Sequence, residues 1–167
     1  FTDNSAIFGG GISAYSDNVD MTITSCTFKD NTATLHGGGM HVYSGHDSMT
    51  ITSSTFSGNT AADYGGGMYI YGENLRMTLT ACNFSVNTAA NDGGGISVYT
   101  GNDGMTFTSC TFSENTANDD GGGIAVYSGN DGMTLTSCTF SDNIAAYGGG
   151  LFVSTVNILM MLTSCSF

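Results

Sequence analysis

Residues 121–145 read GGGIAVYSGNDGMTLTSCTFSDNIA, and the same pattern recurs along the whole chain. A glycine triplet opens each unit, at residues 9, 37, 65, 93, 121 and 148, so the spacing is 28 residues four times and then 27. A fixed period in the range of about 20 to 50 residues indicates a solenoid, whose units bury their apolar faces against their neighbours. The sequence therefore predicts a single array over 1–167 with six coils of 27–28 residues.

Each unit contains three short segments with the alternation typical of strands. In the unit quoted above they span 124–127, 133–136 and 138–140, are rich in β-branched and aromatic residues, and are separated by Gly, Asn, Asp and Ser. Stacking such units at about 4.8 Å per coil gives parallel strands. The predicted fold is all-β, a right-handed parallel β-helix with three short strands per coil; its hand follows the rule for parallel crossovers.

Stacking units of equal length brings equivalent residues into columns along the axis. We expect columns of Met, Cys, Phe and aliphatic side chains inside, packed like on like. The asparagine column is expected to form an amide ladder, each side chain bonding the next coil. The phenylalanine column is Phe28, Phe56, Phe84, Phe112 and Phe140, and the asparagine column is Asn31, Asn59, Asn87, Asn115 and Asn143.

The five cysteines share one inward position, with Ser54 in the missing place. Buried thiols that act as small hydrophobes are the favoured interpretation. Disulfides between adjacent coils and a metal site are the alternatives. The cysteines are Cys26, Cys82, Cys110, Cys138 and Cys165.

A tetrapeptide with Phe first and Asn last occurs in each unit and is followed by a glycine cluster and Ile, Met or Leu. The pattern resembles the FxxN and GGA[ILV] repeats of the chlamydial polymorphic outer-membrane proteins, with a third glycine in place of the family's alanine. The resemblance covers the whole chain and implies a β-helix of the autotransporter-passenger type, exported to the cell surface or outside the cell, with an adhesive or structural role and no catalytic residues. The tetrapeptides are Phe28-Lys29-Asp30-Asn31, Phe56-Ser57-Gly58-Asn59, Phe84-Ser85-Val86-Asn87, Phe112-Ser113-Glu114-Asn115 and Phe140-Ser141-Asp142-Asn143.

The composition excludes several partners. Lys29 and Arg76 are the only strong cations against 14 carboxylates, for a formal charge of −12. Nucleic acid is not an expected partner, because phosphate binding requires clustered Lys and Arg. No apolar stretch approaches the roughly 20 residues of a transmembrane segment. The expected partners are further copies of the chain joined end to end, other surface proteins and glycans, at the cell surface or outside the cell.

Alternate threonines face outward on the second predicted strand and form a candidate surface-binding ladder. Their spacing is about 4.8 Å along the axis and about 6.7 Å along the strand. Such an array resembles the ice-binding faces of antifreeze solenoids, and threonine is also simply a favoured solvent-side residue of strands. The ladder is Thr22, Thr24, Thr50, Thr52, Thr78, Thr80, Thr106, Thr108, Thr134 and Thr136.

A second outward line carries tyrosine, and the loop after it is acidic. Stacked tyrosines could cover the strand, contact a protein or dock a sugar. We interpret the acidic loops as solvated turns, with Ca²⁺ as the alternative and no other cofactor expected. Asn83 begins the only glycosylation sequon. The tyrosines are Tyr15, Tyr43, Tyr71, Tyr99 and Tyr127.

The last coil is more apolar outside than the others. Val156, Ile158 and Leu159 stand where the other coils have an acidic loop, Met161 replaces an outward threonine, and all four are candidate assembly contacts. We therefore expect a segment that continues end to end, within a longer chain or as a head-to-tail filament.

The leading functional hypothesis is a structural or adhesive solenoid, with fibre formation by end-to-end stacking. Ice binding through the threonine ladder is the first alternative. A polysaccharide-binding or polysaccharide-active β-helix is the second. We expect no enzyme, because no coil gathers the convergent carboxylates that such chemistry requires.

Overall fold

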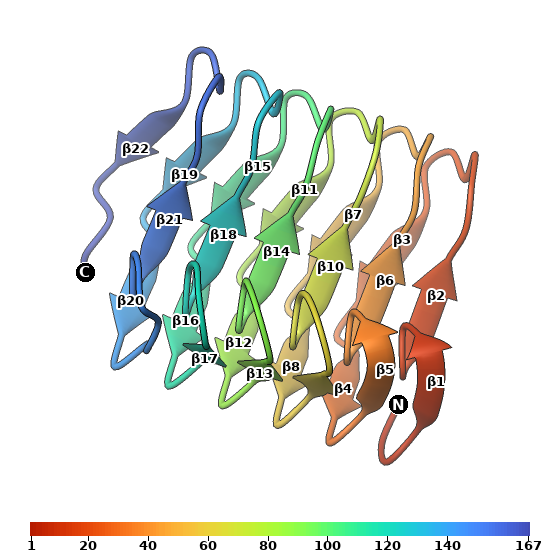
Figure 1. The fold of residues 1–167 in the computed structure, drawn as a ribbon. Helices are drawn as coiled ribbons and strands as arrows, with labels where there is room; N and C mark the ends of the chain where they lie inside the picture. The colour runs from red at the N-terminus through yellow and green to blue at the C-terminus, as the bar shows by residue number, and fades with distance from the viewer.

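The computed structural model describes residues 1–167 and shows a parallel β-helix (Figure 1). All 22 strands pair in parallel with their counterparts in adjacent coils, and there is no helix. Equivalent residues of successive units pair with each other. Leu79, for example, lies opposite Ile51 of the preceding coil and Phe107 of the following coil. The all-β fold and the stacking of equivalent residues are therefore confirmed.

The strands form four sheets, which we name by their position in the unit. The post-glycine sheet contains β2 (Ile12–Ala14), β6 (Met40–Val42), β10 (Met68–Ile70), β14 (Ile96–Val98), β18 (Ile124–Val126) and β21 (Leu151–Val153). The threonine sheet contains β3 (Thr22–Thr24), β7 (Thr50–Thr52), β11 (Thr78–Thr80), β15 (Thr106–Thr108), β19 (Thr134–Thr136) and β22 (Met161–Thr163). The phenylalanine sheet contains β4 (Thr27–Lys29), β8 (Thr55–Ser57), β12 (Asn83–Ser85), β16 (Thr111–Ser113) and β20 (Thr139–Ser141). The alanine sheet contains β1 (Ser5–Phe8), β5 (Thr32–His36), β9 (Thr60–Ala61), β13 (Thr88–Ala89) and β17 (Thr116–Ala117).

The alanine sheet is a fourth strand position beyond the three expected. It follows the phenylalanine sheet after a sharp corner, where one residue adopts a positive φ, as Glu114 does at 55°. Ser109, with φ 53°, makes the corresponding corner before Cys110. These corners are occupied by Ser, Glu, Asp and Val as well as Gly, and only Gly commonly adopts a positive φ. The sequence therefore did not predict a corner at these positions.

The predicted inward columns fill the interior. The phenylalanine rings stack almost parallel, with centroids 4.4 Å apart for Phe28 and Phe56 and 4.6 Å apart for Phe56 and Phe84. Side chains of the methionine, aliphatic and cysteine columns join the same buried cluster. Each buried phenylalanine stabilises the fold by about 1.5–3 kcal/mol relative to an exposed one.

The glycine triplets let neighbouring coils approach closely. A methyl group placed on Gly94 would lie 2.5 Å from the carbonyl oxygen of Gly122 and 2.6 Å from the backbone nitrogen of Thr116. Both contacts are with backbone, which cannot move aside. Glycine is required here because it leaves room for the next coil.

The predicted asparagine ladder is present and buried. Asn87 donates through Nδ2 to Asn115 Oδ1 and to the carbonyl oxygen of Phe56, each at 2.9 Å. Its own Oδ1 accepts from the backbone nitrogen of Asn59 at 3.0 Å and from Asn59 Nδ2 at 2.9 Å. The side chain thus satisfies its hydrogen bonds without water.

A second ladder runs through the loops that were expected to be solvated turns. Asn74 donates through Nδ2 to Asn102 Oδ1 at 2.7 Å, and Asn102 donates to Asn130 Oδ1 at 2.9 Å. The three amides are buried, as is His46 in the same column. The expectation was wrong for this column: these side chains point inward and tie the loops together.

The cysteine column contains five free thiols. Cys82 donates through Sγ to the carbonyl oxygens of Ile51 at 3.4 Å and Thr80 at 3.5 Å. Cys110 repeats this arrangement one coil later with Leu79 and Thr108. Cys82, Cys110 and Cys138 are buried among apolar side chains, as the favoured interpretation predicts, while Cys26 and Cys165 at the ends of the column are half-buried.

Candidate functional site

The threonine ladder lies on the outer face of the threonine sheet. Its two columns are in register over five coils, since Thr78 pairs with Thr50 and Thr106, and Thr80 with Thr52 and Thr108. The same pairing joins β3 to β7 and β15 to β19. In the sixth coil Met161 takes the place of the first threonine and Thr163 continues the second column. The structure therefore places all ten predicted threonines on one face.

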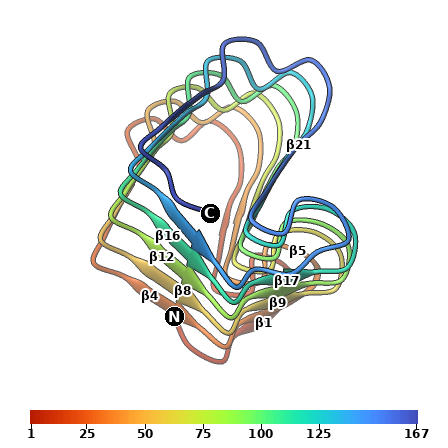
Figure 2. The same ribbon diagram turned by 90° about the vertical axis from the view of Figure 1, so that its left-hand side faces the viewer.

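A second surface, which the sequence did not predict, lies on the outer side of the post-glycine sheet. The loop after the alanine sheet forms a lobe that curls back beside this sheet, as the view along the axis shows (Figure 2). Between lobe and sheet is a pocket of about 370 Å³. We call it the aromatic groove, and it is lined by Phe8, Ser13, Tyr15, His36, His41, Tyr43, Tyr69 and Tyr71.

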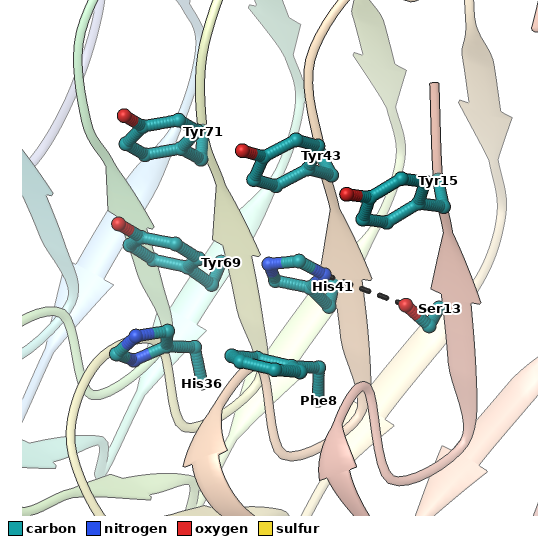
Figure 3. A pocket seen from close by; sticks show the side chains of 8 residues that line it. All are labelled: Phe8, Ser13, Tyr15, His36, His41, Tyr43, Tyr69 and Tyr71. Atoms are coloured by element: carbon teal, nitrogen blue, oxygen red, sulfur yellow. Dashed lines mark hydrogen bonds between the residues drawn. The ribbon is translucent and has the colours of Figure 1, made fainter. Parts of the chain in front are cut away.

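Three columns build the aromatic groove (Figure 3). One wall is the tyrosine column after β2, β6 and β10, in which the rings of Tyr15 and Tyr43 lie 4.7 Å apart and 1° from parallel. The next pair, Tyr43 and Tyr71, lies 5.3 Å apart at 16°. Because equivalent residues stack coil on coil, the three rings form an offset, nearly parallel row along the axis, and their hydroxyl groups point the same way along this row (Figure 3).

The floor and the opposite wall come from two further columns. His41 and Tyr69 stack on the floor at 5.6 Å and 11°, and Ser13 occupies the same position in the first coil. Phe8 and His36 extend from the lobe and pack on this floor, with Phe8 5.1 Å from His41 and His36 4.8 Å from Tyr69. These contacts hold the lobe against the sheet.

Burial keeps the histidines of the aromatic groove neutral. It lowers the pKa of His41 from 6.5 to about 4, with a smaller contribution from the charge of His36. Burial also lowers the pKa of His36, and Asp63, whose carboxylate is 3.5 Å from His36 Nδ1, opposes this effect. Burial raises the pKa of Tyr69. Near neutral pH the floor therefore carries no charge.

The residues that line the aromatic groove come from the first three coils only. The floor position becomes Ser97 and then Ala125, both fully buried. Tyr127 leans across this small floor and donates its hydroxyl to Asp120 at 2.9 Å, while the backbone nitrogen of Asp120 donates to Asp92. Burial, together with hydrogen bonds to Asp92 and Asp120, raises the pKa of Tyr127.

The sequence showed only one of the three columns. The tyrosine column was recognised as an outward line, but His41 and Tyr69 stand in the middle of a three-residue strand, at a position occupied in other coils by Ser, Ala and Phe. Phe8 and His36 immediately precede a glycine triplet. Aromatic residues at both positions in the first coils were the available signal, and the curl of the lobe joins them.

The remaining predicted site residues lie apart from both surfaces. Glu73, Asp103 and Asp131 line a shallow depression along the loops. No group of three or more His, Cys, Asp or Glu side chains is arranged to hold a metal ion. Asn83 lies half-buried on the phenylalanine sheet between Thr55 and Thr111.

The apolar residues of the last coil are exposed. The exposed fraction is 70% for Val156, 56% for Ile158, 78% for Leu159 and 58% for Met161. Their predicted role as assembly contacts stays a prediction.

Comparison with protein families gives a match over residues 1–160 to the family described as the right-handed β-helix region. The chain belongs to the right-handed β-helix family. Membership agrees with the predicted hand of the solenoid. The right-handed β-helix family includes enzymes and non-enzymes, so the expected lack of catalytic activity stays a prediction, as does the resemblance to the chlamydial repeats.

Other comparisons add little to this family assignment. No curated protein matches this β-helix chain. A solved structure of full-length QnrB1, a plasmid-mediated fluoroquinolone resistance protein, is 12% identical and aligns over 82% of this chain and 93% of its own, with a TM-score of 0.15. The β-helix contains no helix with the length and hydrophobicity of a membrane-spanning segment.

Proposed function

We propose that this β-helix is a structural and adhesive protein of the cell surface or extracellular space, and that its contact face is the threonine sheet. The observation that carries the proposal is the register of the two threonine columns over five coils. Each pair of threonines offers the same hydroxyl and methyl groups as the pair before it. A partner with its own repeat can therefore engage several pairs at once.

Repetition is what gives such a face useful affinity. A single threonine contact is weak, because one hydrogen bond contributes about 0.5–1.5 kcal/mol net. Linked sites bind with an avidity well above that of each one, provided that their geometry allows simultaneous contact. The stacked core and the two amide ladders hold the spacing fixed. Glycan polymers and repetitive surface proteins are the partners that fit.

The adhesive role can be tested by binding the purified chain to glycan arrays and to intact cells. The double variant Thr78→Lys/Thr106→Lys places two long cations in the middle of the ladder and should lower binding by about tenfold or more. Ser85→Lys/Ser113→Lys is the matched control, with the same charge change on adjacent rungs of the phenylalanine sheet. If both double variants lose binding to the same extent, the threonine sheet is not the contact face.

Ice is a second candidate ligand of the same face. It is favoured by the register of the array, with threonines about 4.8 Å and about 6.7 Å apart in two directions. A rigid lattice of hydroxyl and methyl groups can match a crystal surface. Thermal hysteresis and the shape of growing ice crystals should then change with the native chain and not with Thr78→Lys/Thr106→Lys. No effect of the native chain on ice growth would eliminate this candidate.

A further inference from the structure

We propose that the cysteine column binds soft divalent metal ions of the Hg²⁺ class, each held in linear two-coordinate geometry between the sulfurs of adjacent coils. This inference goes beyond the proposed function, which uses the outer face of the threonine sheet, because the cysteines lie on the inner side of the solenoid. Four of the five thiols occupy consecutive coils, and we call them the thiol row. They are Cys82, Cys110, Cys138 and Cys165.

The four thiols of the row have the same orientation. Each Sγ donates to two carbonyl oxygens, one from the residue two places earlier and one from the preceding coil. For Cys110 these oxygens belong to Thr108 and Leu79, each at 3.5 Å. The same two contacts are 3.4–3.6 Å long for the other three thiols. Because every thiol repeats these contacts, successive sulfurs are related by the shift from one coil to the next.

That shift determines how far apart the sulfurs are. Parallel strands lie about 4.8 Å apart. Two residues after the cysteines, the ring centroids of Phe112 and Phe140 are 4.9 Å apart, and those of Phe140 and Phe167 are 4.8 Å apart. A disulfide requires its sulfurs at about 2.05 Å. Adjacent thiols of the row are therefore too far apart to bond to each other directly.

The separation fits a metal ion between two sulfurs. A metal–thiolate bond is about 2.3–2.4 Å long, as in zinc sites, so an ion midway along a gap of about 4.8 Å has two bonds of normal length in a straight line. Zinc itself requires four ligands in a tetrahedron. No group of three or more His, Cys, Asp or Glu side chains offers such an arrangement. Thiolates select soft metals, and the row therefore fits soft ions that accept two ligands in line.

The charge of the complex selects a divalent ion. Cys82, Cys110 and Cys138 are each 1% exposed and belong to the apolar core. When Hg²⁺ binds, each of two thiols loses its proton, two S–Hg bonds form, and the S–Hg–S unit is neutral. Ag⁺ or Cu⁺ in the same place would leave a charge of −1. An uncompensated charge is unfavourable in an apolar interior.

The row has room for two ions. Linear two-coordination uses each sulfur once, so four consecutive sulfurs form two pairs. Cys26 is outside the row because Ser54 stands in the adjacent coil, where its hydroxyl donates to the carbonyl oxygen of Thr52 at 2.9 Å and accepts from the backbone nitrogen of Cys26 at 3.1 Å. We therefore expect two bridging ions in a chain that has five thiols. The pairs are Cys82 with Cys110 and Cys138 with Cys165.

The test is a titration of the reduced, intact chain with HgCl₂, followed by mass spectrometry and X-ray absorption. A bridging ion adds one Hg and removes two hydrogens, whereas an ion on a single thiol keeps a chloride and removes one hydrogen. Two bridging ions per chain are expected, each with two sulfur neighbours and each releasing two protons. Five ions that keep their chloride would overturn the proposal.

Three variants of the column test the pairing. Ser54→Cys joins Cys26 to the row and should raise the number of bridging ions from two to three, a gain that a damaged fold cannot produce. Cys110→Ser should lower the number to one. Cys26→Ser is the matched control, since it removes a thiol of the same column outside the row, and should still bind two. An unchanged number in Ser54→Cys, or equal losses in Cys26→Ser and Cys110→Ser, would contradict binding between adjacent coils.

Two further ions test the class of metal. Glutathione offers the same thiolate ligand in water, so exchange with it compares ions independently of the strength of their metal–sulfur bonds. Because the bound Ag⁺ unit would carry a buried charge, about tenfold less glutathione should remove Ag⁺ than Hg²⁺. Equal retention of both ions would overturn the assignment of a divalent ion. Zn²⁺ should not bind to the folded chain, and tight Zn²⁺ binding would overturn the linear geometry.

Discussion

Single residues at the corners of the coils carry unfavourable backbone conformations. Val86 has φ 57° and is 55% exposed, although a β-branched side chain is poorly suited to the left-handed region. The same corner is occupied by Asp30, Gly58 and Asp142 in other coils, with φ of 53°, 65° and 55°. The corner is imposed by the stacking of coils, and the residue at position 86 adapts to it.

Replacing Val86 should therefore stabilise the protein. Val86→Asn keeps a side chain and removes the β-branch, and asparagine tolerates this conformation. We expect a gain of about 1 kcal/mol in the free energy of unfolding, measured by denaturant titration. Ser85→Asn, one residue earlier in an extended strand, is the control and should have little effect. A loss of stability in Val86→Asn would contradict strain at this corner.

His41 makes stability depend on pH. Its pKa is lowered from 6.5 to about 4 in the folded chain, so the unfolded chain binds more protons between these values. Stability should therefore fall as the pH drops from about 6.5 to about 4, with no further loss from this group below that. His41→Phe retains a ring between Phe8 and Tyr69 and cannot titrate.

Thermal melts of wild type and His41→Phe between pH 4 and pH 7 check this expectation. The difference between the two curves should grow as the pH falls, since titration of the carboxylates is common to both proteins. His36, whose pKa is also lowered, is still present in His41→Phe, so the stability of this variant will also decrease to some extent as the pH falls. Parallel curves over the whole range would show that His41 is not the group responsible.

At the scale of the elements, the columns matter more than the strands. Most strands contain only two or three residues, too few to be stable as isolated strands. Hydrogen bonds between coils run also through the corners and loops, where the two amide ladders lie. The ladders stabilise each coil against slipping along its neighbour, because an asparagine finds its partners only in register.

Breaking one ladder should be costly. Asn87→Ala removes the acceptor of the Asn59 backbone N–H and one acceptor of Asn59 Nδ2, and it removes the side-chain donor to the carbonyl oxygen of Phe56. We expect a loss of about 2–4 kcal/mol in the free energy of unfolding, because these buried polar groups lose partners. Asn118→Ala, at an exposed loop position, is the control. A loss below about 1 kcal/mol would mean that water replaces the missing amide.

At the scale of the whole molecule, the outer surface changes along the axis. The outer surface of the sixth coil carries apolar side chains where the fifth coil has polar ones, since Ile158 replaces Asp131 and Met161 replaces Thr134. The exposed apolar residues Val156, Leu159 and Met161 lie in the same coil. Apolar patches of this kind commonly mark contacts between proteins.

Self-association of the 167-residue chain should therefore depend on this coil. Val156→Ser/Leu159→Ser/Met161→Thr makes its outer surface resemble that of the earlier coils. We expect the apparent mass in light scattering to rise with concentration for wild type and much less for the variant. Val19→Ser/Val86→Ser, which removes exposed apolar side chains elsewhere, is the control. A wild-type chain that stays monomeric at high concentration would contradict the assembly proposal.

The sequence by itself determined the solenoid, the number of coils and the inward columns of the strands, including the phenylalanine and first asparagine columns. Phe84 stacks on Phe56 and Asn87 bonds Asn115 because a constant unit length places equivalent residues one above another. The threonine ladder follows for the same reason, since strand alternation fixes which side chains face outward. These features depend only on period and parity, which are visible in a single chain.

The path within one coil was decided only by the tertiary structure. The corner at Glu114, the inward turn of Asn102 and the curl of the lobe that brings His36 onto Tyr69 have no counterpart in the period. A repeat fixes what lies above and below a residue but not what lies beside it within the coil. The aromatic groove is a contact of that second kind, between residues before and after a glycine triplet, where the first glycine turns the chain with a positive φ, as Gly37 does at 69°.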